Sequence, residues 1–488
     1  MIIPKPQKII KLDQNPYVIK AGDNAQTVLK EAKLDDTLAN QSYVLTVGAD
    51  GATISYGSEV SKAYAIKSLE QLLLTCTGTI DAMRIEDEPS VNYRGYMLDV
   101  SRYFFTVEEV LEQIDFMAEY KFNALHLHLT DDQGWRVEIK SHPKLTEIGS
   151  VRYRTLFKLR KHKGYYTQED LKRIVDYAHS RNIIVIPEVD LPGHFQSAVA
   201  AYPELGCYGE GVKVAENFGV KYEVACIGKE STISLIKDVL KELAEIFTDE
   251  YFHIGGDEVP SHRWSYCPHC KAKYESLGCK NWVEYQAHFM NELASYLKDL
   301  GKKVIMWNET EITGLVDKDV IWQYWQGGLK EDDLVKEVNA GRKVIVSCCE
   351  PYYLDLPYSK NDLKRVYEHK PCFDGMNKEN FIGAETCMWS ELVPNVNVLK
   401  RRAFPRLLAV AEGIWNGSAN YDDFIKALKS HRTILARYGV KNTPRCKYEP
   451  KGLIKLALNL WWARRVLYWG GLQNLITNAK IEKLTKRR

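Results

Sequence analysis

The chain has 488 residues, with 66 basic and 64 acidic side chains, a length that suits two or three domains or one large barrel with an attachment. Its balanced charge excludes the general attraction to nucleic acid or acidic membranes that a strongly basic protein has. No apolar run reaches the roughly 18 residues that a membrane span needs, and the first residues lack a secretory hydrophobic core. We therefore expect a cytoplasmic protein without a transmembrane span or a nucleic-acid partner.

Residues 1–88 are expected to form a small N-terminal α/β domain. Short apolar runs alternate there with polar segments, and residues 63–74 carry apolar positions at helical spacing. The region contains no cluster of catalytic residue types. The acidic, proline-containing segment 86–90 is the expected linker to the next domain.

Residues 89–418 show strand patterns that alternate with helix patterns. Eight strands in such an alternation predict a (β/α)₈ TIM barrel, and an open doubly wound sheet is the alternative. The expected strands are 95–99, 124–130, 183–189, 251–255, 303–307, 320–324, 343–347 and 381–388. The expected helices include 107–120, 167–181, 231–247, 282–300 and 331–340.

Residues 419–488 are expected to form a C-terminal helical region. Its first helix, 421–438, is expected to close the barrel. An aromatic and basic segment then predicts a helix from Gly452 that ends at Gly470-Gly471. We expect this helix to pack on the barrel or its neighbour domain, although such a helix could also lie on a membrane surface or form a subunit contact. The sequence leaves open whether the chain is a homo-oligomer.

Reactive and aromatic side chains follow every predicted strand of the barrel. Active sites of such barrels lie at the carboxyl ends of the strands. Those ends carry Asp99 with Arg102, then 130–132, Glu188 and Asp190 with His194, 257–258, 307–309, Trp325, 352–355 and 389–391. Tryptophan faces stack on the C–H face of a pyranose while carboxylates bind its hydroxyls, so this pattern indicates a sugar site.

The segment 251–260 is the clearest part of this pattern, because a short apolar strand leads through two glycines to the adjacent carboxylates Asp257 and Glu258. The same four letters, Gly-Gly-Asp-Glu, begin the GGDEF signature of diguanylate cyclases. Here Val259 replaces the phenylalanine of that signature, and no phosphate-binding glycine loop stands nearby.

Eleven cysteines, odd in number and scattered, indicate reduced thiols rather than a disulfide framework. Cys267-Pro-His-Cys270, with Cys279 nearby, resembles half of a zinc site. Zinc usually takes two such pairs, and a second C-x-x-C is missing from the sequence. We therefore expect a plain loop, and the sequence does not decide whether Cys267 and Cys270 bind a metal.

Four long motifs, in order, resemble the family 20 glycoside hydrolases, the β-N-acetylhexosaminidases. They are 94–99 with 101–105, 126–136, 187–194 and 253–259, within a resemblance that spans about residues 90–415. The resemblance implies an exo-acting, retaining hydrolase of terminal non-reducing β-linked GlcNAc or GalNAc, without a cofactor. In this family the substrate's own 2-acetamido oxygen attacks C1 and gives an oxazolinium-type intermediate.

The resemblance also implies a role for each site residue. Glu258 is the general acid, which must stay protonated near neutrality, and burial beside another carboxylate favours that state. Asp257 accepts the acetamido N–H, while Asp131 holds His194 and His194 holds Glu258. The implied substrate contacts are Arg94 at the outer hydroxyls, Tyr353 at the acetamido carbonyl, Asp355 and Glu391 at further hydroxyls, and the walls Trp307, Trp325 and Trp389. Trp322 is an alternative to Trp325.

Two other functions fit parts of the pattern. A non-catalytic sugar-binding barrel would keep the pocket, although the acid, the orienting residue and the relay are all present. A metal-dependent amidohydrolase would use His126 and His128, which share one face of a strand. The residues that follow them belong instead to the hexosaminidase pattern, whose mechanism requires no metal. The sequence does not distinguish GlcNAc from GalNAc or identify the aglycone.

Overall fold

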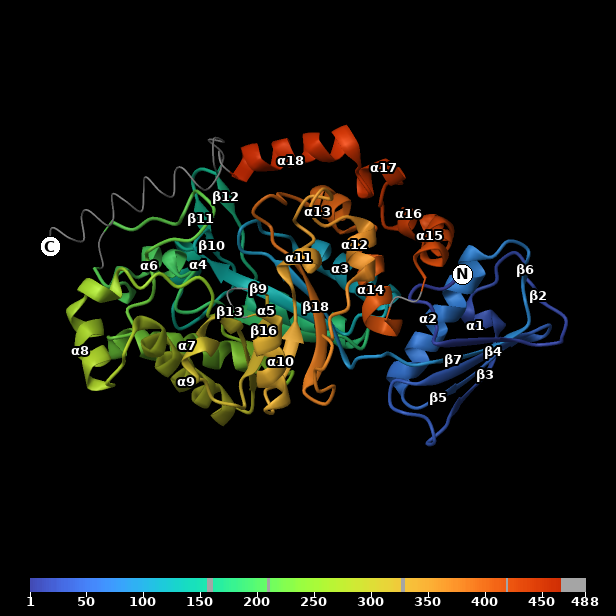
Figure 1. Cartoon of the computed structure of the whole chain (residues 1–488), viewed down its shortest axis with the longest axis horizontal. Helices are drawn as coiled ribbons and strands as arrows, with labels where there is room; N and C mark the ends of the chain where they lie inside the picture. The colour runs from blue at the N-terminus through green and yellow to red at the C-terminus, as the bar shows by residue number, and fades with distance from the viewer. Residues whose placement is uncertain (156–160, 209–210, 326–329, 418–419, 467–488) are drawn as a thin grey trace.

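A closed parallel barrel forms the centre of the computed structural model, which describes residues 1–155, 161–208, 211–325, 330–417 and 420–466 (Figure 1). Its strands, in spatial order, are β8 (Tyr93–Asp99), β9 (Ala124–Asp131), β13 (Ile184–Val189), β14 (Tyr251–His253), β15 (Lys303–Trp307), β16 (Ile321–Tyr324), β17 (Val344–Val346) and β18 (Phe381–Met388). The barrel closes because β8 pairs in parallel with both β9 and β18. The predicted barrel is confirmed, and the open sheet is excluded.

Helices cover the outside of the barrel where the sequence predicts them. They include α3 (Val107–Glu119), α5 (Gln168–His179), α7 (Glu230–Ile246), α9 (Trp282–Asp299) and α10 (Glu331–Asn339). The helix α3 begins at Thr106, whose side chain accepts a hydrogen bond from the Glu109 amide in a capping box, and it buries Val110 and Ile114. A capping box at Thr167 starts α5 in the same way.

β18 is followed by α13 (Val396–Ala403) and then by α14 (Arg406–Asn416), and it is α14 rather than the predicted helix 421–438 that packs on this strand. It packs between β18 and α12 (Leu363–Glu368), and all of its residues from Arg406 to Trp415 are buried. Residues 421–438 instead form α15 (Tyr421–Ser430) and α16 (Arg432–Arg437), and α16 contacts the small domain.

The small N-terminal domain is a mixed five-stranded sheet with helices, as predicted. The sheet order is β1 (Lys8–Lys11), β7 (Met83–Asp87), β4 (Tyr43–Gly48), β5 (Gly51–Tyr56) and β3 (Leu29–Leu34). The helix α2 (Glu59–Thr75) packs on β4 and β5. Figure 1 shows this domain at one end of the molecule, beside the barrel.

A fully buried ion pair joins the small domain to the barrel. Nζ of Lys121, a barrel residue, lies 3.1 Å from Oδ2 of Asp87 and donates to the hydroxyl oxygen of Tyr43 at 2.9 Å. The Trp415 indole donates to the other oxygen of Asp87 at 2.9 Å, and its ring lies 4.5 Å from the Lys121 ammonium. Burial lowers the pKa of Lys121, and the charge of Asp87 opposes that effect. The ammonium therefore depends on its partners in the small domain.

Arg94 belongs to the same contact between domains, which corrects its predicted role at the substrate. Its guanidinium donates to the carbonyl of Lys121 at 2.8 Å and to the Tyr64 hydroxyl at 2.6 Å, and it lies 5.0 Å from the Trp415 ring centre. Arg94 is the second residue of β8, whereas the carboxyl end of that strand is Asp99. Its side chain therefore lies at the end of the barrel opposite to the predicted site.

The C-terminal region continues through α17 (Arg445–Tyr448) to α18 (Gly452–Val466), which runs along the barrel in Figure 1. The guanidinium of Arg402 lies 5.6 Å from the Trp461 ring centre, while Leu453 and Leu460 are exposed. The predicted helix is present and touches the barrel, and its predicted end at Gly470-Gly471 lies outside the described residues. Among the described helices, none is long and apolar enough to cross a membrane.

We expect Lys121→Met to lower the free energy of unfolding by about 3–5 kcal/mol, because it leaves the buried charge of Asp87 without its cation. Denaturant unfolding followed by circular dichroism measures this effect. The control is Lys62→Met, which breaks the partly exposed pair with Glu59 and should cost less than about 1 kcal/mol. Equal effects of the two substitutions would contradict the importance of the buried pair.

Candidate active site

At the carboxyl end of every barrel strand lies at least one polar or aromatic side chain of the kind expected for a sugar site. Because the barrel is closed, these ends surround one opening. In strand order the residues are Arg102, Asp131, His194, Asp257 with Glu258, Trp307, Trp325, Tyr353 with Asp355, and Trp389 with Glu391. Of the predicted site residues, only Arg94 lies elsewhere.

The adjacent carboxylates Asp257 and Glu258 are positioned by the two glycines that follow β14. Gly255 has a φ of +67°, and a Cβ at this position would lie 1.8 Å from Oδ1 of Asp190, so only glycine fits. Glu258 itself has a φ of +49°, a conformation that costs about 1–3 kcal/mol in a residue with a side chain. Its amide donates to Oε2 of Glu309 at 2.6 Å, which fixes this turn.

His194 lies between Asp131 and Glu258, as the predicted relay requires. Its Nδ1 is 3.3 Å from Oδ1 of Asp131, and its Nε2 is 3.6 Å from Oε2 of Glu258 and 3.8 Å from Oδ2 of Asp257. The side chain of His194 is only 3% exposed, whereas that of Glu258 is 42% exposed. The relay therefore runs from a buried carboxylate to one that reaches the opening.

Asp131 holds the relay through charge. Burial alone would raise its pKa, but the Arg102 guanidinium at 2.5 Å, His194, and His128 at 3.0 Å lower it well below the usual range. Burial acts against a charged His194, yet Asp131 and Asp190 raise the pKa of His194 well above its ordinary value. The structure thus favours an imidazolium at His194 paired with an ionised Asp131.

The pKa of Glu258 is lowered in the free site, whereas the pKa values of its neighbours Asp257 and Glu309 are raised, which differs from the expectation for the general acid. Burial opposes ionisation of Glu258, but the nearby His194, whose Nε2 lies 3.6 Å from Oε2 of Glu258, outweighs it and lowers the pKa of Glu258. Burial, together with the Glu258 charge, raises the pKa of Asp257 to about 6 against the influence of His194. Burial and the charge of Asp257 raise the pKa of Glu309 to about 8. Sequence adjacency alone could not show the effect of His194, which acts through space.

Four aromatic rings form one side of the site. The ring centres of Trp307 and Trp389 are 5.9 Å apart, those of Tyr353 and Trp389 are 5.8 Å apart, and Trp325 stacks on Tyr353 at 6.5 Å with nearly parallel planes. Trp325 belongs to this cluster. Trp322 faces the main core instead, with the Arg342 guanidinium 4.4 Å from its ring centre. The structure therefore resolves the ambiguity between these two tryptophans.

Arg102 is the arginine of the site, a residue that the sequence placed at a strand end but did not assign to the substrate. It lies over the Trp389 ring at 4.9 Å, and its Nε has no hydrogen-bond partner among the described residues. Burial raises the pKa of Glu391, and the positive charge of Arg102 opposes this rise. Burial and Glu391 raise the pKa of Asp355 to about 7. These three side chains therefore form a polar group beside the aromatic wall.

His126 and His128 support the site from inside the barrel. His128 contacts Glu188 through Nδ1 at 2.5 Å and Asp131 through Nε2 at 3.0 Å, so both of its ring nitrogens are engaged. Nδ1 of His126 lies 2.9 Å from Glu385. Glu188 also accepts a hydrogen bond from the Trp307 indole at 2.8 Å. This buried network fixes both the relay and the aromatic wall.

Sequence reasoning did not assign roles to Arg102, Glu309 or Asp190, although all three appear in the predicted polar strand ends. Arg102 holds Asp131, Glu309 binds the amide of Glu258, and Asp190 packs under Gly255. Their place at the strand ends was the available signal. Their particular contacts depend on loop conformation, which the residue pattern does not give.

Comparison with known proteins identifies the relatives of this chain. The family described as Glycosyl hydrolase family 20, catalytic domain, matches residues 91–418, and its domain 2 matches residues 7–88. A beta-hexosaminidase of Porphyromonas gingivalis is 36% identical over 83% of this chain, which spans 54% of that protein. One from Akkermansia muciniphila is 32% identical over 82% of this chain and 85% of its own length.

Solved structures agree with these matches. The crystal structure of a beta-N-acetylhexosaminidase has a TM-score of 0.85 and 31% identity, and the match covers 91% of this chain and 98% of that one. An exo beta-N-acetylglucosaminidase from Vibrio harveyi, solved in complex with N-acetylglucosamine, has a TM-score of 0.80 and 29% identity over 91% of this chain and 78% of that one. The chain therefore belongs to glycosyl hydrolase family 20.

Proposed function

We propose that the protein is an exo-acting, retaining β-N-acetylhexosaminidase that removes terminal non-reducing β-linked GlcNAc or GalNAc by substrate-assisted catalysis. The observation that carries the proposal is the arrangement of Asp131, His194, Asp257 and Glu258 beside a wall of aromatic rings. The names of the relatives, among them an exo beta-N-acetylglucosaminidase in complex with N-acetylglucosamine, support the same activity.

Glu258 is the proposed proton donor to the leaving oxygen, because it is the carboxyl group of the relay that reaches the opening. In the free protein His194 lowers the pKa of Glu258. A substrate that fills the opening would remove water from this carboxylate, which favours its neutral form. After departure of the aglycone, the same group would accept a proton from the water that opens the intermediate.

Asp257 is the proposed acceptor for the acetamido N–H of the substrate. Its Oδ1 is buried and has no hydrogen-bond partner among the described residues, so it offers a site for one donor. Burial and nearby negative groups, Asp257 among them, raise the pKa of Tyr353 well above its ordinary value. The hydroxyl of Tyr353 therefore stays protonated and can donate to the acetamido carbonyl. Held between these two groups, the amide oxygen would attack C1 as the bond to the aglycone breaks.

The two alternative functions receive less support from the site. A non-catalytic sugar-binding barrel does not require a protonated His194, held by Asp131, next to the accessible carboxylate of Glu258. A metal-dependent amidohydrolase would need the nitrogens of His126 and His128 for an ion, whereas these side chains contact Glu385, Glu188 and Asp131. Hydrolysis that is unchanged by a chelator at a temperature well below the unfolding transition would exclude an amidohydrolase, whose reaction requires its ion.

The proposal is tested by hydrolysis of a chromogenic β-N-acetylglucosaminide, with the released sugar followed by proton NMR. We expect the β-anomer to appear first, before mutarotation, because two displacements at C1 retain its configuration. Initial release of the α-anomer would contradict the assisted mechanism, and no release from GlcNAc or GalNAc substrates would contradict the activity.

Glu258→Gln should lower kcat by about 10²–10⁴-fold on a substrate with a poor leaving group, because the variant cannot donate a proton. The loss should be much smaller with a nitrophenyl leaving group, which departs without protonation. Comparison of kcat on these two substrates measures the difference. Equal losses on both would show that Glu258 does not act as the acid.

Asp257→Ala should lower kcat/KM for the 2-acetamido substrate by about 10²–10³-fold, the usual loss when one group that stabilises the transition state is removed. The preference for the 2-acetamido over the 2-hydroxy sugar should fall with it. Both values come from steady-state kinetics on matched glycosides. If the wild type cleaves the 2-hydroxy glucoside equally well, assistance by the acetamido group is wrong.

Arg102→Lys and Arg94→Lys form a matched pair that tests whether Arg102, rather than Arg94, binds the substrate. Arg102→Lys should lower kcat/KM by about 10–100-fold, since hydrogen bonds from a charged group contribute about 1.5–3 kcal/mol and lysine lacks the planar fork. Arg94→Lys should lower the thermal unfolding temperature and leave kcat/KM unchanged. The reverse result would return Arg94 to the substrate site.

A further inference from the structure

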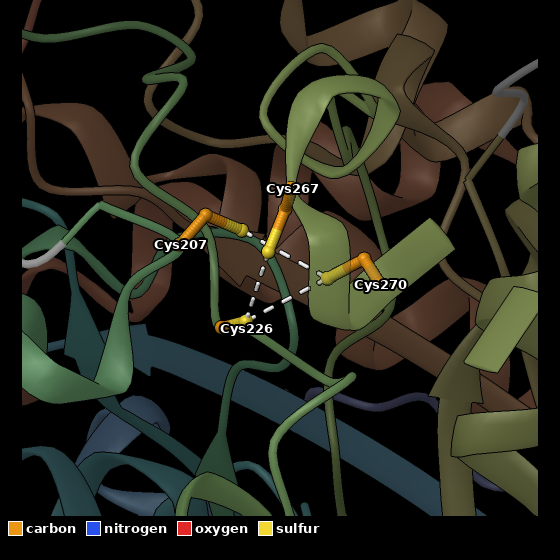
Figure 2. Close-up of side chains that lie close together, drawn as sticks. All are labelled: Cys207, Cys226, Cys267 and Cys270. Carbon is orange, nitrogen blue, oxygen red and sulfur yellow. Dashed lines mark hydrogen bonds between the residues drawn. The ribbon is translucent and has the colours of Figure 1, made fainter. Parts of the chain in front are cut away.

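Four cysteine sulfurs lie close together outside the proposed active site. Figure 2 shows the side chains of Cys207, Cys226, Cys267 and Cys270 pointing toward one another. Their sulfur atoms all lie within 4.8 Å of one another, at 3.6 Å for Cys226 to Cys267, 3.6 Å for Cys226 to Cys270, and 3.9 Å for Cys207 to Cys270. Three of the four residues are buried, and Cys207 is partly buried.

These distances fit a tetrahedral metal site better than disulfides. A disulfide requires sulfurs about 2.05 Å apart. Four thiolates at about 2.3 Å from a central zinc lie about 3.8 Å from one another, close to the observed separations. Tetrahedral sites with four sulfur ligands are typical of zinc or iron, and a fully protein-ligated site is typical of structural zinc.

The sequence also supplies the local features of a zinc knuckle. Cys267 precedes α8 (Pro268–Ser276), and Cys270 lies in the first turn of that helix. Cys267 is the residue that caps the amino-terminal end of α8. Amides and the positive end of a helix stabilise negative charge, so this turn suits thiolates.

The second pair of ligands comes from residues that are far apart in sequence, which is why a second C-x-x-C is missing. Cys207 follows η1 (Pro203–Leu205), and Cys226 precedes α7. The amide of Cys226 donates to the carbonyl of Leu205 at 2.8 Å, which brings the two together. A Cβ on Gly228 would lie 2.4 Å from the Cys270 nitrogen, so the glycine lets this loop reach the knuckle.

We propose that Cys207, Cys226, Cys267 and Cys270 bind one structural Zn²⁺. Four protein ligands leave no open coordination position, so the ion would stabilise the structure rather than take part in hydrolysis. The site joins the loop between β13 and α7 to the segment that runs from Glu258 to Cys267. The Trp264 indole of that segment donates to the carbonyl of Ala225 at 2.9 Å, which ties the same two loops. Zinc would therefore support the turn that carries the proposed acid.

Metal analysis of the full chain, purified under reducing conditions without chelator, tests the site. We expect about one zinc per chain in the wild type and at least a tenfold loss in the double variant Cys226→Ser, Cys270→Ser. Cys279→Ser is the matched control, because Cys279 is a buried cysteine of the same region outside the cluster. It should keep the zinc content of the wild type.

A measurement on the wild type alone covers the case in which the double variant does not fold. Blocking thiols with a mercurial reagent, in the presence of a colorimetric zinc indicator, should release one zinc per chain. A strong chelator should lower the thermal unfolding temperature of the wild type, and added Zn²⁺ should restore it. Zinc below a tenth of an equivalent after incubation with Zn²⁺, full zinc in the double variant, or iron in place of zinc would each overturn the proposal.

Discussion

The buried carboxylate of Asp131 is the interaction on which the rest of the site depends. It accepts contacts from Arg102, His128 and His194, which come from the ends of three neighbouring strands. An isolated ion in this position would cost several kcal/mol, so the three donors and the carboxylate require one another. Through His194 this charge reaches Glu258, and through His128 and Glu188 it reaches Trp307. One anion thus aligns the proton relay with the aromatic wall.

The two ends of the barrel have different roles: one contacts the small domain, and the other carries the proposed site. At the amino-terminal end, Lys121 is neutralised by Asp87 and Arg94 is hydrogen-bonded to Tyr64, and both partners belong to the small domain. At the carboxyl-terminal end, Oδ1 of Asp257 and Nε of Arg102 have no partner in the described part of the chain. These unpaired atoms lie at the end of the barrel that carries the proposed site, where a substrate could bind them.

The barrel could be predicted from the sequence because its strands and most of its outer helices alternate in a regular pattern, whereas α14, buried along its length, was not among the expected helices. The proximity of Asp131, His194 and Glu258 could be predicted because these residues occupy long motifs. Arg94 was misassigned by the resemblance, although it precedes the predicted strand 95–99 and therefore lies at the end away from the site. Arg102, in the same motif, follows that strand. The cysteines that surround Cys267 could not be predicted, and neither could the lowering of the Glu258 pKa by His194. Both depend on contacts between segments that are distant in sequence.

The buried pair of Lys121 and Asp87 has a consequence for how such a protein can change over evolution. A barrel separated from residues 1–88 would keep the ammonium of Lys121 but lose the carboxylate and the hydroxyl that solvate it. Recombination that exchanges residues 1–88 for an unrelated domain would leave Lys121 without these partners. A different module that buries position 121 must therefore supply an anion there or meet an uncharged side chain.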